Sequence, residues 1–302
     1  MANVTANDGN YTRSVGSVEG LYVFLAALNT FLSITASLSN AVILIALHKV
    51  TSIYPPTKLL FRCLAVTDLC VGLISQPPFA LTNLDIIWDG IFHFFSASTI
   101  AFTAVSILTL TAISVDRLLA LMMGLRYRHV VTLRRVRALI ICVWILSCAL
   151  AAGTQFWVNN FHPITFHVLI VLIILCVLTS IISHTKIYLR LRHHQIHLQE
   201  NLQQQGQPPN RGEIPLNIAR YKKTVSSIAW VQLALLICYL PLSVYHILWF
   251  HDVLNLGIIA SDVTFSFLFL NSSLNPILYC WKIKDVRQAV KDTIKFNCCA
   301  SS

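Results

Sequence analysis

Charged side chains are scarce in this chain: they make up 11% of its 302 residues, whereas hydrophobic residues make up 56%. A soluble globular protein carries about 25% charged residues, so the composition argues against a soluble chain and favours several membrane spans. The sequence also lacks an internal repeat, and it lacks an apolar stretch within residues 1–17. We therefore expect no cleavable signal peptide, so that the first span inserts itself.

Seven apolar runs are each long enough to cross the roughly 30 Å hydrocarbon layer of a bilayer. They cover residues 20–47, 58–82, 92–123, 137–158, 163–189, 224–250 and 257–281. We predict an all-α membrane protein, a bundle of seven transmembrane helices with a short amphipathic eighth helix. Its parts are an extracellular N-terminal tail, the membrane domain, and a cytosolic amphipathic helix with its tail: residues 1–19, 20–282 and 283–302.

Basic residues indicate how the chain is oriented. Of the 22 Lys and Arg residues only Arg13 precedes the first span, and the other 21 lie in or beside the loops after spans one, three and five or in the C-terminal tail. The positive-inside rule predicts an extracellular N-terminus and a cytosolic C-terminus. The net charge of +10 then suits anionic lipid and cytosolic partners, and it gives no reason to expect nucleic acid. N-glycosylation sequons at Asn3 and Asn10 fall in the outer tail.

The C-terminal segment is expected to lie along the membrane surface. Two neighbouring stripes run along it at helical spacing, the basic Arg287, Lys291 and Lys295 and the apolar Val286, Val290 and Ile294. Cys298 and Cys299 follow and are placed for palmitoylation. None of the nine cysteines falls clearly in a predicted outer loop, so we expect no structural disulfide.

Residues 271–279 place amides and hydroxyls inside the last span. Asn271, Ser272, Asn275 and Tyr279 are polar, and Pro276 deprives a backbone carbonyl of its helical partner. An unsatisfied polar group in lipid costs several kcal/mol, so these groups must face other protein or trapped water. The stretch is either a functional site or a kinked helix packed by polar side chains.

Other spans carry polar residues as well. An ionised Asp68 at mid-depth costs roughly 2.5 to 3.5 kcal/mol, so a cation, a proton or a polar cluster is expected beside it. Asn40 alone is more typical of packing between helices. Asp116 and Arg117 end the third span at the cytosolic boundary, and Pro241 predicts a hinge in the sixth.

Together and in this order, these residues resemble the signature of the rhodopsin-like (class A) G-protein-coupled receptors. The matching residues are Asn40, Asp68, Asp116, Arg117, Trp144, Pro241, Asn275, Pro276 and Tyr279. The short loops, the missing outer disulfide and the tail that begins at Trp281 look most like the adenosine and melanocortin receptors. The individual receptor is not identified.

The resemblance implies roles for particular residues. A sodium pocket that favours the inactive state would consist of Asp68, Ser106, Asn271, Ser272 and Asn275. The switch for a heterotrimeric G protein would consist of Asp116, Arg117, His184, Tyr239, Pro241, Pro276 and Tyr279. In the resting receptor Asp116 would hold Arg117, which would then meet the Gα C-terminus when the sixth span moves outward.

Several positions depart from the family pattern. Tyr239 stands where the family usually has a switch Trp, Leu118 replaces a Tyr, and His184 is expected in place of the Tyr that bridges to Arg117. No acid lies near Tyr221, where some members hold the Arg. These differences lead to the hypothesis that the resting state is weakly held and basal signalling is high.

The sequence limits the ligand without naming it. Thr99 occupies the position of the Asp in aminergic receptors, and Phe269 occupies that of the retinal Lys, so neither a classical amine receptor nor an opsin is expected. The predicted outer face is acidic, which suits a cationic peptide, while a small neutral ligand or a merely solvated rim also fits. Candidate pocket residues are Gln76, Thr99, Thr103, Tyr239, Ser243, His246 and Phe265.

Arrestin recruitment is expected to be weak, because Thr293, Ser301 and Ser302 are the only hydroxyl residues after Lys284. A seven-span transporter or channel is the alternative, although such proteins usually show repeats or several charges within the membrane. The spans contain no His-x-x-x-His or Gly-x-Ser-x-Gly pattern, so no enzyme is expected. His193 and His197 have zinc-ligand spacing but no evident third ligand, so no metal besides sodium is predicted.

Overall fold

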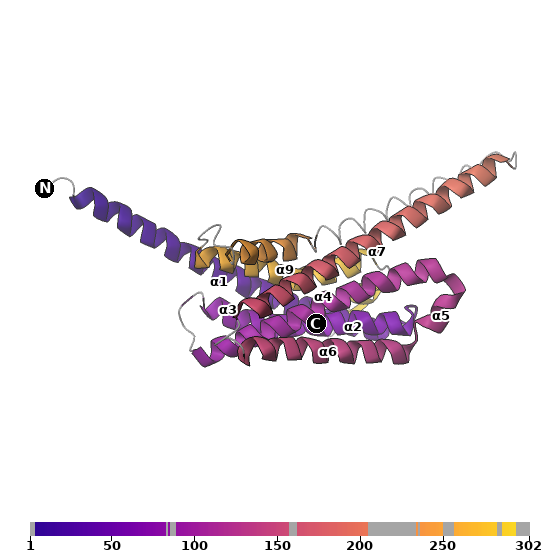
Figure 1. Ribbon diagram of the computed structural model, residues 1–302, viewed down its shortest axis with the longest axis horizontal. Helices are drawn as coiled ribbons and strands as arrows, with labels where there is room; N and C mark the ends of the chain where they lie inside the picture. Colours follow the sequence, from indigo (N-terminus) through magenta and orange to yellow (C-terminus); the bar gives the residue numbers. More distant parts are fainter. Residues whose placement is uncertain are drawn as a thin grey trace.

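The computed structural model of the protein describes residues 4–82, 84, 89–156, 162–204, 234, 236–249, 257–282 and 286–293. This part of the chain is helical and contains no strand (Figure 1). The elements are α1 (Val4–Lys49), α2 (Pro55–Cys70), η1 (Val71–Ser75), α3 (Gln76–Thr82), α4 (Asp89–Met123), η2 (Gly124–Arg126), α5 (Tyr127–Val130), α6 (Leu133–Phe156), α7 (His162–Gln204) and α9 (Ile258–Lys282). A further apolar helix covers Leu236–Trp249.

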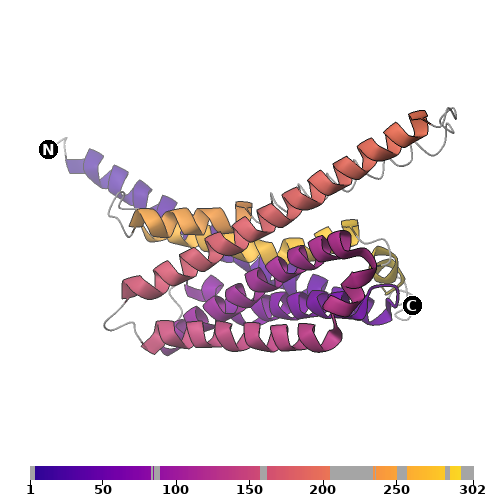
Figure 2. The same cartoon turned by 45° about the vertical axis from the view of Figure 1, so that its right-hand side comes forward.

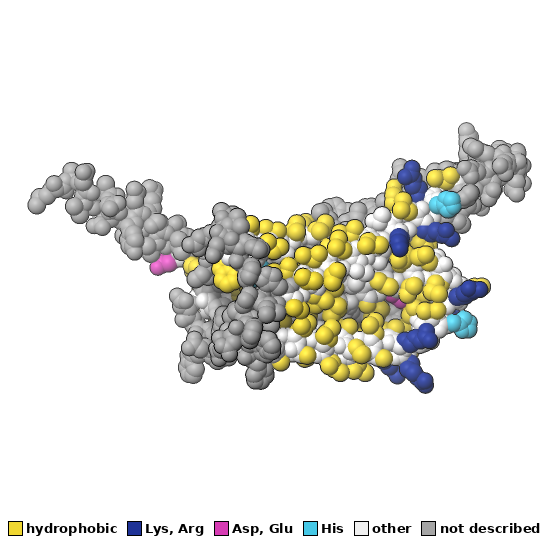
Figure 3. Space-filling model, in the orientation of Figure 1, with side chains coloured by type: hydrophobic (Ala, Val, Ile, Leu, Met, Phe, Trp, Pro, Cys, Tyr) yellow, Lys and Arg dark blue, Asp and Glu magenta, His cyan; other side chains and the backbone are white. Residues whose placement is uncertain are grey.

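The helices match the predicted membrane spans. Five stretches of the described chain are long and apolar enough to cross a membrane: Glu19–Lys49, Pro55–Thr82, His93–Val130, Leu133–Thr154 and Val168–His193. Leu236–Trp249 lies within the sixth predicted span, residues 224–250, and α9 covers most of the seventh, residues 257–281. Large apolar side chains such as Phe31 and Leu38 are 65% exposed. Figure 3 shows a yellow band of hydrophobic side chains across the middle of the visible face. The prediction of an all-α membrane protein is confirmed.

Two helices are longer than the spans they contain. α1 begins at Val4, within the predicted N-terminal tail, and α7 continues to Gln204. Figures 1 and 2 show the two extensions leaving the packed bundle at opposite ends. α4 packs against α2, α6 and α7, while α1 packs against α2 and α9. Asn10 lies on the α1 extension, and Asn3 lies outside the described residues.

The second span is interrupted by a π-helical turn, η1. The prolines at positions 77 and 78 have no N–H, so carbonyls one turn earlier cannot keep their α-helical bonds. Gly72 lies within this turn, and its carbonyl accepts a hydrogen bond of 2.6 Å from Ser33 Oγ of α1. A Cβ atom at Gly72 would lie 2.6 Å from Ser37 Oγ, so only glycine allows this close approach. The sequence predicted a span over residues 58–82 but not the π-helical turn within it.

The predicted eighth helix is present and packs against the bundle. Residues 286–293 are helical. Val286 is 0% exposed and belongs to the same core cluster as Ile43 and Leu47 near the end of α1, while Val290 is partly buried against that cluster. Lys49 Nζ, at the end of α1, donates a hydrogen bond of 3.1 Å to Thr293 Oγ1. Cys298 and Cys299 lie outside the described residues, so their palmitoylation stays a prediction.

Candidate functional site

Asp68 lies at the centre of a buried polar cluster. Its side chain is fully buried, at 0% exposure. Asn275 Nδ2 of α9 donates to Asp68 Oδ2 at 2.8 Å, and Ser106 Oγ of α4 donates to Asp68 Oδ1 at 3.5 Å. The three side chains come from three helices, so the carboxylate joins α2, α4 and α9. The sequence predicted a cation, a proton or a polar cluster beside Asp68, and polar side chains bind it in the structure.

The cluster continues through Asn271 to Tyr239. The two N–H groups of Asn271 Nδ2 have two hydroxyl acceptors, Ser106 Oγ at 3.4 Å and the Tyr239 hydroxyl at 3.3 Å. Tyr239 is 2% exposed and stands two residues before Pro241. A continuous path of hydrogen bonds therefore runs from Asp68 to the helix Leu236–Trp249. We call Asp68, Ser106, Asn271, Asn275 and Tyr239 the central polar cluster.

Pro276 explains the position of Asn40. Because proline has no N–H, the carbonyl four residues earlier, that of Ser272, loses its helical partner. Asn40 Nδ2 of α1 donates to this carbonyl at 3.0 Å. Asn40 thus satisfies a backbone group that the proline leaves unpaired, which agrees with its interpretation as a packing residue. Ser272 itself is 3% exposed and lies on α9, which also carries Asn271 and Asn275 of the central polar cluster.

A second polar cluster surrounds Asp116, toward the C-terminal end of α4. Thr57 Oγ1 donates to Asp116 Oδ2 at 2.9 Å, and the Tyr127 hydroxyl donates to Asp116 Oδ1 at 2.6 Å. Arg117 lies 3.7 Å from Asp116 Oδ2, is 40% exposed, and has its guanidinium 5.6 Å from the centre of the Phe61 ring. Asp116 is therefore bound more closely by two hydroxyls than by the arginine. The sequence missed Thr57 and Tyr127.

The remaining predicted switch residues lie on the expected helices. His184 of α7 is buried, and its Nε2 lies 3.3 Å from Ser114 Oγ of α4. Pro241 lies within the helix Leu236–Trp249 and Pro276 within α9. Tyr279 lies on α9, but its side chain is outside the described residues. These positions do not test the bridge from His184 to Arg117, which stays a prediction.

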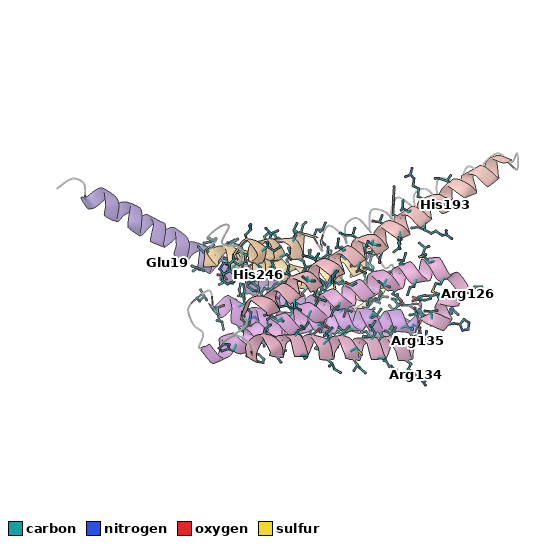
Figure 4. The ribbon with its side chains drawn as sticks, viewed as in Figure 1. Glu19, Arg126, Arg134, Arg135, His193 and His246 are labelled. Carbon is teal, nitrogen blue, oxygen red and sulfur yellow. The ribbon has the colours of Figure 1, made fainter. Side chains whose placement is uncertain are left out.

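The predicted ligand residues are divided among several surroundings. Phe265 of α9 joins an aromatic cluster, with its ring 5.7 Å from that of Phe79. Gln76 is 0% exposed and Thr99 is 4% exposed, and no hydrogen-bond partner for either side chain occurs among the described residues. Ser243 Oγ donates to a carbonyl of its own helix. His246, labelled in Figure 4, meets the Tyr245 ring edge-on at 5.5 Å, and Thr103 on α4 is half-buried.

Charged side chains separate along the bundle. Arg126, Arg134, Arg135 and His193 lie at one end, and Glu19 lies at the other (Figure 4). Figure 3 shows basic side chains gathered at the end of the apolar band where Arg126, Arg134 and Arg135 lie. Within the described residues, no group of three or more His, Cys, Asp or Glu side chains could hold a metal ion.

Comparison with known proteins agrees with this arrangement. Residues 39–279 match the family described as 7 transmembrane receptor (rhodopsin family). The chain belongs to the rhodopsin family of seven-transmembrane receptors. The receptor is 22% identical over 346 residues to the mouse (Mus musculus) 5-hydroxytryptamine receptor 1B, covering 91% of this chain and 88% of that one. It is 26% identical over 285 residues to the sheep (Ovis aries) adenosine receptor A3, covering 85% of each chain. Both relatives are named as receptors, so the comparisons do not favour the transporter or channel alternative.

Proposed function

We propose that this receptor sits in the plasma membrane with its N-terminus outside and couples an extracellular ligand to activation of a heterotrimeric G protein. The observation that carries the proposal is the path of hydrogen bonds from Asp68 through Ser106 and Asn271 to Tyr239. This path joins the buried carboxylate to the helix that contains Pro241, where a hinge is expected. An outward movement of the helix Leu236–Trp249 would therefore alter the surroundings of Asp68.

Sodium is proposed as an allosteric ion at the central polar cluster. The donor set fits the ion, because a hard cation prefers carboxylate, hydroxyl and amide oxygens, and the cluster supplies all three. Asp68 would supply the charge, while Ser106, Ser272, Asn271 and Asn275 would hold the carboxylate and the ion. The bound ion would neutralise Asp68 and so favour the resting arrangement of the helices. An agonist would act through its different affinity for the two states.

The cluster around Asp116 supports the hypothesis of high basal signalling. The hydroxyls of Thr57 and Tyr127 both donate to Asp116, which reduces the negative charge available to Arg117. Arg117 remains 40% exposed, so water also weakens the ion pair. A weak pair leaves Arg117 available to meet the Gα C-terminus without agonist.

Weak arrestin recruitment is part of the same proposal. Thr293 is 4% exposed, accepts a hydrogen bond from Lys49 and donates to the Ala289 carbonyl at 2.7 Å. A kinase cannot reach this hydroxyl while the eighth helix is docked. Ser301 and Ser302 are then the hydroxyls that remain for phosphorylation after Lys284, and both lie outside the described residues. Clustered phosphates, which arrestin capture requires, would be scarce.

A cell assay tests this function. Gα activation without ligand would be compared across the four Gα families for the wild type and Arg117→Ala, with surface amounts matched through an N-terminal tag. We expect at least one family to be activated by the wild type and not by Arg117→Ala. Detection of the tag on intact cells checks the orientation. Cells with and without the receptor that show equal Gα activation would contradict high basal signalling.

A further inference from the structure

The ring of Phe61 on α2 lies against the guanidinium group of Arg117. The central carbon of the guanidinium lies over the ring, 5.6 Å from its centre. A cation within about 6 Å of an aromatic centre is attracted by the negative face of the ring, and Arg makes such contacts more often than Lys. Arg117 therefore makes a cation–π contact with a neighbouring helix besides its contact with Asp116.

The ion pair with Asp116 holds this arginine loosely. Arg117 Nη2 lies 3.7 Å from Asp116 Oδ2, which is longer than a hydrogen bond. Both carboxylate oxygens already accept a hydrogen bond, Oδ2 from Thr57 and Oδ1 from Tyr127. The ring of Phe61 is thus a second group that can hold the guanidinium in place.

One face of α2 contacts both members of the pair formed by Asp116 and Arg117. Thr57 and Phe61 are four residues apart, so they lie one turn from each other on the same face of the helix. Thr57 Oγ1 binds the carboxylate, and Phe61 lies against the guanidinium. The side chain of Arg117 is therefore turned toward α2.

The ring of Phe61 is fixed by its packing. It is 6% exposed and belongs to the core cluster that also contains Cys238 and Leu242 of the helix Leu236–Trp249. A closely packed ring cannot follow the guanidinium, so the cation–π contact is lost when Arg117 moves away from α2. An outward movement of the helix Leu236–Trp249 would also repack the cluster that holds the ring.

We propose that Phe61 is a positioning residue that restrains the G-protein switch, because its ring holds Arg117 against α2 and away from the Gα C-terminus. The proposal rests on the proposed function, since it adds a regulatory contact to the arginine that would meet Gα. Arg117 is 40% exposed, so water weakens the contact. The restraint therefore limits ligand-free signalling without abolishing it.

Packing alone is the competing explanation for Phe61, because the ring fills the core cluster whether or not a cation lies over it. Fluorine separates the two explanations. Each ring fluorine withdraws electron density from the face and weakens its attraction for a cation, while the size of the ring changes little. Mono-, di- and trifluorinated phenylalanine at position 61 therefore weaken the contact stepwise. Phe102, half-buried on α4 with its ring 6.2 Å from that of Trp144, takes the same series as the control.

The first test measures thermal unfolding of the full-length receptor in lipid nanodiscs. Trifluorination at position 61 should lower the unfolding midpoint more in the wild type than in Arg117→Ala, which has no guanidinium over the ring. Trifluorination of Phe102 should shift the midpoint equally in both backgrounds. Equal shifts for position 61 as well would show that Phe61 and Arg117 are not coupled and would overturn the proposal.

The second test measures ligand-free nucleotide exchange on purified Gα with the same receptors. Exchange should rise with each fluorine at position 61 and stay level in the Phe102 series, and complete loss of the contact corresponds to a rise of about two- to fivefold. Exchange that stays level for position 61, while the wild type still exceeds empty nanodiscs, would overturn the restraint and leave the receptor function standing. If no receptor exceeds empty nanodiscs although the first test shows coupling, the proposed function fails, and the regulatory role of Phe61 fails with it.

Discussion

The Tyr239 hydroxyl accepts a hydrogen bond from Asn271 Nδ2 at 3.3 Å, and this contact joins the helix of Pro241 to α9. A tryptophan at this position would offer an N–H donor but no acceptor. Asn271 would then have one hydroxyl acceptor in place of two. The tyrosine is therefore suited to this polar cluster, and its replacement should affect stability through the hydroxyl alone.

Tyr239→Phe tests that contact. The change leaves an N–H of Asn271 buried without its acceptor, so we expect a loss of about 1–3 kcal/mol in stability and a lower midpoint of thermal unfolding. Tyr245→Phe is the control, because Tyr245 is half-buried on the same helix and its ring contact with His246 is retained. Equal midpoints for Tyr239→Phe and wild type would show that the hydroxyl contributes nothing.

Asp68→Asn tests the sodium proposal. The amide keeps the size of the side chain and removes its charge, so a cation should no longer bind. For the wild type, sodium at about ten times its dissociation constant should add about 1.4 kcal/mol of stability relative to N-methylglucamine. Asp68→Asn should show the same midpoint in both salts. A wild-type receptor that is indifferent to sodium would refute the proposed ion.

Tyr127→Phe tests the hold on Asp116. Without the 2.6 Å hydrogen bond, the carboxylate keeps more of its charge for Arg117, so the ion pair strengthens and ligand-free Gα activation should fall. Tyr54→Phe is the matched control. Tyr54 packs against the Tyr127 ring at 5.4 Å but donates to the Val131 carbonyl, so its hydroxyl does not bind Asp116. Activation that rises with Tyr127→Phe would contradict this explanation of basal activity.

Gly72→Ala tests the π-helical turn. Its Cβ would lie 2.6 Å from Ser37 Oγ and 3.0 Å from the Ser33 carbonyl, so α1 and η1 must separate. We expect a loss of about 1–3 kcal/mol in stability, measured as a lower unfolding midpoint. Gly153→Ala on α6 is the control, since no atom lies within 4 Å of its added Cβ. A Gly72→Ala receptor as stable as Gly153→Ala would show that close packing here is unnecessary.

Part of the central polar cluster could be predicted because polar groups in a membrane need partners, so a polar cluster was one of the expectations beside Asp68. The membership of Ser106, Asn271 and Asn275 came from the family resemblance, and hydrogen bonds join these side chains in the structure. The prediction from the sequence missed Thr57, although a hydroxyl in the first turn of α2 was a weak signal for it.

Other features depend on contacts between helices that the sequence does not reveal. Tyr127 binds Asp116 only because η2 and α5 turn the chain back beneath α4, where Gly124 has a positive φ of 51°. The contact of Ser33 with the Gly72 carbonyl inside the π-helical turn joins two helices and has no signal in the sequence. The pairing of Tyr239 with Asn271 likewise depends on how two helices are rotated, which hydrophobic periodicity does not determine.

The most direct measurement is nucleotide exchange on purified Gα in the presence of the full-length receptor in lipid nanodiscs. Wild type, Arg117→Ala and empty nanodiscs would be compared for each of the four Gα families without added ligand. The account predicts that the wild type accelerates exchange on at least one Gα and that Arg117→Ala matches empty nanodiscs. Exchange that is equal for wild type and Arg117→Ala, or equal for wild type and empty nanodiscs, would contradict it.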